Sequence, residues 1–163
     1  MSYKRFAIMV ATSTVVMFGL MYLNTYSIGH ATYSQTRTWM AILMGAVMAI
    51  IMIGFMWSTY EDKRLNMAII AGAVIVFGGA LWLVRSQATV DDVSYMEAMI
   101  PHHSIAIMTS ERAHIRDPRV RKLADGIIAA QVREIAEMKA LTADLKAHPV
   151  PKGQPDLRPI PAH

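Results

Sequence analysis

Three apolar runs of membrane-spanning length decide most of what this chain can fold into. They cover residues 6–23, 39–57 and about 67–84, each has 18 or 19 residues, and none contains a charged side chain. A helix needs roughly 20 apolar residues to cross a hydrocarbon core of about 30 Å. The sequence therefore predicts a three-helix transmembrane anchor within residues 1–85.

The basic residues that flank these runs predict an orientation. Lys4 and Arg5 precede the first run, Lys63 and Arg64 lie in the second loop, and the first loop (residues 24–38) has only Arg37. Because cytoplasmic loops are enriched in Lys and Arg, we expect the N-terminus and second loop in the cytoplasm. The expected location is the bacterial cytoplasmic (inner) membrane, multi-pass and surrounded by lipid, with the C-terminal domain in the periplasm. A cleaved signal peptide over residues 1–31 is the alternative, but the run is long for one and two more spans follow.

The second half of the chain has the composition of a water-soluble domain. Residues 86–163 contain ten basic and ten acidic residues, so the net charge of +4 belongs to the membrane half. Because this half has no net positive charge, we expect no nucleic-acid partner. The chain has no cysteine, which excludes disulfides, thiolate metal sites and cysteine nucleophiles.

Two helix-prone segments follow the membrane half. They cover residues 91–115 and 118–146, and between them Asp117 suits an N-cap and Pro118 suits the first helical position. Helices joined by so short a turn form an antiparallel hairpin. The predicted fold is therefore all-α: three membrane helices, a helical hairpin in an extracytoplasmic domain at 86–147, and a Pro-rich extended tail at 148–163.

Both helices of the hairpin show a heptad-like seam with polar residues at its centre. In the second helix the seam residues are spaced alternately by four and three, and its centre holds Gln131 and Glu134: Val120, Ala124, Ile127, Gln131, Glu134, Met138, Leu141 and Leu145. A buried carboxylate normally has a partner or a metal. In the first helix the same spacing brings Met96, Met99 and His103 into the seam, with His102 beside them. Residue numbers that sum to about 234 are expected to face each other, which places His103 opposite Gln131 and Met96 opposite Met138.

This mixture of side chains suits a transition metal. Thioether and imidazole ligands favour copper, Cu(I) more than Cu(II), although another transition metal would also fit. Methionine and histidine also suit an oxidising compartment, where exposed cysteines are lost to oxidation. The predicted metal ligands are Met99, His103, Glu134 and Met138, with His102, Met96 and Gln131 in support. Pro101 should also free the backbone carbonyl of Glu97 beside this site.

The hairpin resembles the family called domain of unknown function 305. Three pieces carry the resemblance, which covers residue 91 to about residue 145: Met99, His102 and His103; Asp117, Pro118, Leu123 and Ala124; Gln131, Glu134, Ile135 and Met138. The resemblance implies a ferritin-like helical fold, and some members look like periplasmic copper-binding proteins. It implies nothing about residues 1–85.

Each of these features also has a plainer interpretation. The methionines can be core filler, the histidine pair can lie on the surface, and Gln131 with Glu134 can fix helix register as a buried polar pair. Met40, Met44, Met48, Met52 and Met56 recur every four residues in the second membrane run, which indicates either a soft-metal path or ordinary membrane packing.

The expected function is metal binding in copper homeostasis, resistance or delivery, without catalysis. Glu111 and His114 match half of a di-iron motif, but they lie near the turn, far from Glu134. The alternative is a structural or accessory module that docks on a membrane complex. A hairpin of this size buries little surface alone, so we expect a homo-oligomer, a dimer or higher, that completes a four-helix bundle. A membrane complex or a metallochaperone is a further expected partner.

Overall fold

The computed structural model describes residues 2–151, 153–157 and 160, and these residues form helices without any strand. The order is α1 (Tyr3–Leu20), a 3₁₀ turn η1 (Ile28–His30), α2 (Gln35–Phe55), α3 (Lys63–Ser86), α4 (Asp92–Arg112) and α5 (Pro118–Ala147). The all-α prediction is confirmed, and so is the division into three apolar helices and a helical hairpin.

Helices α1, α2 and α3 are long and apolar enough to cross a membrane. Each begins three or four residues earlier than the apolar run that predicted it, because polar residues at the ends still continue the helix. N-caps explain these starts: Ser2, Ser34 and Asp62 accept hydrogen bonds from backbone amides in the first turns of α1, α2 and α3.

The three helices form an upright bundle whose core lies at the end near the N-terminus. Phe6, Ile53 and Tyr60 are buried there with small residues of α2 and α3. Tyr3 Oη donates to Asn66 Oδ1 over 2.8 Å, which ties the start of α1 to α3. Gly45 allows α1 to approach α2, because a Cβ at this position would collide with the side chain of Thr14.

The methionine stripe of α2 faces different surroundings along its length. Met40 and Met44 are exposed, whereas Met52 and Met56 pack against the core of the bundle.

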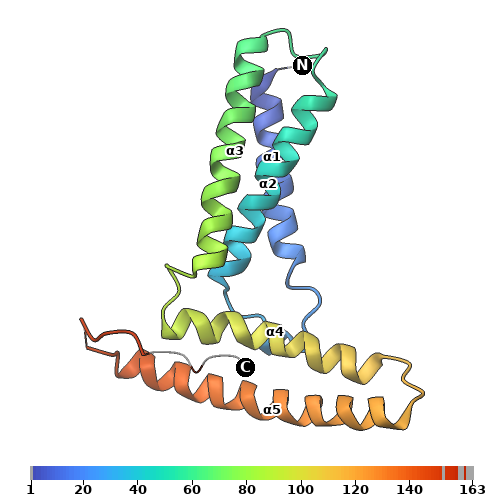
Figure 1. Cartoon of the computed structure of the whole chain (residues 1–163), viewed down its shortest axis with the longest axis vertical. Helices are drawn as coiled ribbons and strands as arrows, with labels where there is room; N and C mark the ends of the chain where they lie inside the picture. Colours follow the sequence, from blue (N-terminus) through green and yellow to red (C-terminus); the bar gives the residue numbers. More distant parts are fainter. Residues whose placement is uncertain (1, 152, 158–159, 161–163) are drawn as a thin grey trace.

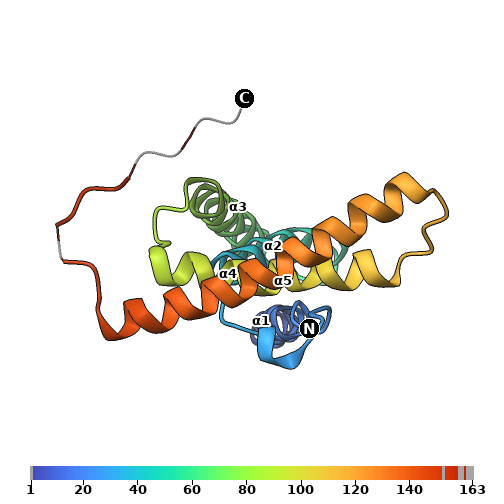
Figure 2. The same cartoon turned by 90° about the horizontal axis from the view of Figure 1, so that it is seen from below.

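The hairpin lies across the other end of the bundle, opposite the N-terminus and the α2–α3 loop (Figure 1). Helix α4 lies between α5 and the bundle, and it contacts both η1 and α2. Seen from below, α5 crosses α4 at an angle instead of running parallel to it (Figure 2).

Local sequence sets the ends of the hairpin helices. Asp91 caps α4 through Ser94 N, and Asp117 caps α5 through Arg119 N, with Pro118 in the first turn as predicted. Helix α4 continues through Pro101, which is buried. The described tail residues after α5 form no helix or strand, and residues 152, 158–159 and 161–163 lie outside the described part of the chain.

Candidate metal centre

His103 of α4 and Glu134 of α5 meet across the hairpin. Nδ1 of His103 lies 3.1 Å from Oε2 of Glu134, with the histidine side chain 16% exposed and the carboxylate side chain 41% exposed. The two atoms are close but not aligned for a hydrogen bond, so Nδ1 is buried without an aligned partner. Two of the predicted ligands are therefore adjacent, and the pair is open to solvent on the Glu134 side.

The electrostatics of this pair favour a neutral imidazole. Burial lowers the pKa of His103, the Glu134 carboxylate opposes that shift, and the neighbouring His102 adds to it. A neutral imidazole keeps a lone pair free on one ring nitrogen, as metal binding requires.

The other five predicted residues lie at different depths in the hairpin. Met96 is buried, and Met99 is half-buried one turn before His103 on the same face of α4. Met138, one turn after Glu134, packs against the core formed by Ile100, Ile107 and Ile135. His102 is exposed, with its ring centre 6.1 Å from that of His103.

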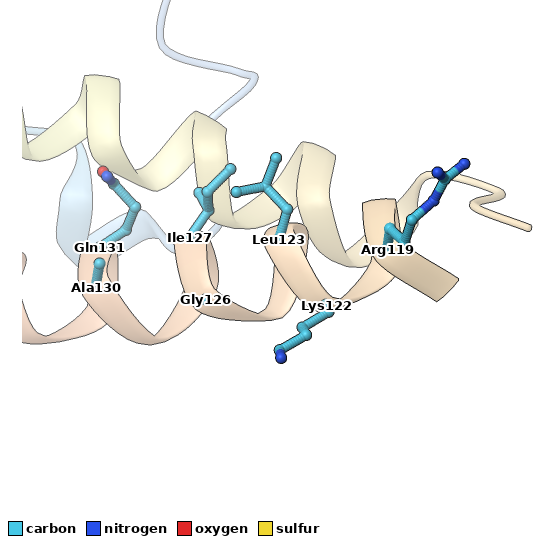
Figure 3. A pocket seen from close by; sticks show the side chains of 7 residues that line it. All are labelled: Arg119, Lys122, Leu123, Gly126, Ile127, Ala130 and Gln131. Atoms are coloured by element: carbon cyan, nitrogen blue, oxygen red, sulfur yellow. The ribbon is translucent and has the colours of Figure 1, made fainter. Parts of the chain in front are cut away.

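Gln131 is half-buried and lies on the open side of α5, which is the side that α4 does not cover. It lines a shallow groove whose other lining residues are Arg119, Lys122, Leu123, Gly126, Ile127 and Ala130 (Figure 3).

The pairing of the two helices differs from the predicted register by about one helical turn. We predicted that His103 would face Gln131, but the structure places Glu134 opposite His103. The crossing of α5 over α4 explains the difference, because a fixed sum of residue numbers holds only for parallel axes (Figure 2).

The geometry of the pair fits a bound metal ion in part. A metal that binds one imidazole nitrogen and one carboxylate oxygen at 2.0–2.2 Å, with an angle of about 90–110° between them, holds these atoms about 2.8–3.6 Å apart. The observed separation of 3.1 Å agrees with that span. However, the described part of the chain brings no three His, Asp or Glu side chains together. Further ligands from this chain would therefore have to be the methionine sulfurs or Gln131.

The first loop of the membrane half holds α4 beside the pair, a contact that we did not predict. Ser104, fully buried, accepts a hydrogen bond from the backbone amide of Tyr26 (2.8 Å), and its Oγ lies 3.0 Å from Nδ1 of His30. Thr32 Oγ1 donates to the backbone carbonyl of Glu97 over 2.6 Å. These contacts flank the segment that carries Met99 and His103.

One part of this arrangement was visible in the sequence. Pro101 has no backbone N–H, so it leaves the carbonyl of Glu97 without its helical partner. In the structure this carbonyl accepts a hydrogen bond from Thr32, so it is not free for another partner there. No local signal indicated His30, Thr32 or Ser104, because their contacts join residues more than 60 positions apart in the chain.

The hairpin and tail match a known family. Residues 88–158 match the family described as Domain of unknown function (DUF305). The chain is also similar to Uncharacterized protein L153 of Acanthamoeba polyphaga mimivirus, with 30% identity over 145 residues, 85% of this chain and 93% of that protein. This alignment is longer than the segment from residue 86 to 163, so it includes part of the membrane half. No solved structure matches the chain. On these similarities, the chain belongs to the DUF305 family.

Proposed function

We propose that this protein is a membrane-anchored metal-binding protein and that its preferred metal is copper, handled for homeostasis, resistance or delivery. The observation that supports this proposal is the meeting of His103 and Glu134 at the centre of the hairpin. Met99 and Met138 lie one turn from each member of the pair. Imidazole and thioether donors together suit Cu(I).

Orientation is part of the same proposal. The hairpin lies outside the cytoplasm, where a site without cysteine tolerates oxidation. The N-terminus and the α2–α3 loop, which carry Lys4, Arg5, Lys63 and Arg64, share the opposite end of the bundle (Figure 1). This arrangement agrees with a single cytoplasmic side for all four basic residues.

Copper titration of the full-length protein in detergent tests the proposal. The full chain is needed because the loop of the membrane half holds α4. The double substitution His103→Ala with Met99→Ala should lower Cu(I) affinity by at least 100-fold, since two of about four donors are lost. A matched control, His114→Ala with Met67→Ala, removes the same residue types at exposed positions and should keep wild-type affinity. Wild-type binding no tighter than that of the His103/Met99 variant would reject the proposal.

A second candidate is a structural module that docks on a membrane complex. The exposed apolar side chains along α5, Leu123 and Val132 among them, favour it. In that case Glu134 serves only to fix the helix register, and copper does not bind tightly.

A further inference from the structure

We propose that the open side of α5 binds a second copy of this chain, with the two hairpins side by side and antiparallel. The apolar face of α5 is wider than the part that α4 covers. Ala124 and Ile135 are buried against α4, whereas Leu123 is 66% exposed, Val120 49% and Leu141 46%. Val120 and Leu141 belong to the predicted seam, so two of its eight residues stay exposed in a single chain.

The uncovered face has room for a closely approaching helix. Gly126 lies in the groove, and a Cβ there would meet no atom within 4 Å (Figure 3). A glycine inside a helix costs about 1 kcal/mol relative to alanine, and no residue in the described part of the chain occupies the space that it leaves. Ala130 follows one turn later on the same face, so two small residues mark the place where a second helix fits.

The direction of the groove suits two copies in one membrane. Leu123 is about 100° around the helix from Ala124, which is buried against α4. The groove therefore does not face α4 but opens sideways, next to it. Because α4 lies between α5 and the bundle, that side runs along the membrane surface (Figures 1 and 2). A two-fold axis perpendicular to the membrane that passes near Ala130 would bring the same face of α5 from each copy together as an isologous contact, with the groove of one copy facing the second half of α5 in the other.

Charge complementarity selects an antiparallel second copy as the occupant. The turn end of the hairpin is basic: between residues 111 and 122 it has Arg112, Arg116, Arg119, Arg121 and Lys122 against Glu111 and Asp117. The open end, formed by the start of α4 and the end of α5, is acidic: it has Asp91, Asp92, Glu97, Glu137 and Asp144 against Lys139 and Lys146, and Lys146 pairs with Glu97. A two-fold axis places the basic end of one hairpin against the acidic end of the other, and along α5 it brings Lys122 toward Glu137 of the second copy.

This contact would also cover the open side of the His103–Glu134 pair, since Gln131 lines the groove and Glu134 lies one turn further along α5. The proposed contact between two copies does not require bound metal, so it can be tested separately from the copper-binding proposal.

Disulfide trapping in native membranes tests the proposal, because the chain has no cysteine of its own. Ala130 lies toward the Gln131 end of the groove, close to the two-fold axis that the pairing of Lys122 with Glu137 implies, so Ala130→Cys should form a disulfide-linked dimer on mild oxidation. Ala136→Cys, exposed on another face of α5, is the matched control and should remain monomeric. Equal trapping of both variants, no trapping of Ala130→Cys, or a product whose mass indicates a different protein would overturn the proposal.

Two further changes test the packing and the direction. Adding Gly126→Leu to Ala130→Cys should reduce trapping at least tenfold, while the open space around Gly126 leaves the single hairpin intact. Lys122→Glu should also weaken trapping, and Lys122→Glu with Glu137→Lys should restore it. Undiminished trapping with Gly126→Leu would contradict the close approach, and failure of the double charge reversal would contradict the antiparallel arrangement.

Discussion

Replacing Glu134 distinguishes two interpretations of this residue, because a metal ligand and a polar group that only fixes helix register predict opposite results. If it binds metal or orients His103, then Glu134→Leu should lower copper affinity by about 10–100-fold. If it fixes only the register, the apolar side chain should leave affinity unchanged and the hairpin as stable or more stable. Isothermal titration with copper, together with thermal unfolding, measures both. Asp144→Leu, an exposed position on the same helix, is the control and should bind copper as the wild type does.

His30 makes the docking of the first loop dependent on pH. Burial lowers its pKa below the ordinary value of about 6.5, and the positive charge of Lys139 adds to the shift. The docked loop therefore favours the neutral ring, whereas an undocked loop binds a proton more readily at acid pH. The stabilisation of the docked loop by neutral His30 is fully present above about pH 6.5, and it is lost as the pH falls through the lower pKa of the docked state.

Hydrogen exchange at the backbone amide of Tyr26, which donates to Ser104, reports this docking. After correction for intrinsic rates, protection should be lower at pH 5.5 than at pH 7.5. His30→Gln cannot titrate in this range and should show a smaller difference. An equal loss of protection in both proteins would assign the effect to another group.

At the scale of helices, the sequence predicted the elements of this fold better than their pairing. Apolar runs, caps such as Asp117 and the Pro101 break are local, so they could be read from neighbouring residues. The pairing of His103 with Glu134 depends on the angle at which α5 crosses α4, which no single helix encodes. The contact of Ser104 with His30 depends on how the membrane half meets the hairpin. For the candidate site, the sequence therefore identified both residues of the central pair, but neither their pairing nor the loop beside them.

The backbone hydrogen bond that Pro101 removes makes α4 dependent on the membrane half. Thr32→Val removes the donor to the Glu97 carbonyl, and Pro101 prevents α4 from supplying another. An unsatisfied carbonyl costs about 1 kcal/mol or more, so exchange of amides in α4 should become about fivefold faster. Thr109→Val is the matched control on α4, because the Thr109 hydroxyl contacts only carbonyls of its own helix. Similar acceleration by both substitutions would show that Thr32 has no special role.

For the whole molecule, the loops at the two ends of the helix bundle predict which residues are accessible from each side of the membrane. The connection between α3 and α4 lies at the hairpin end of the bundle, whereas the α2–α3 loop lies at the opposite end (Figure 1). In the cysteine-free chain, Ala88→Cys should react with a membrane-impermeant maleimide added to intact cells. Glu61→Cys, equally exposed but in the α2–α3 loop, should react only after the membrane is permeabilised. The reverse pattern would place the hairpin in the cytoplasm, against the distribution of basic residues. It would also remove the argument that the absence of cysteine reflects an oxidising compartment.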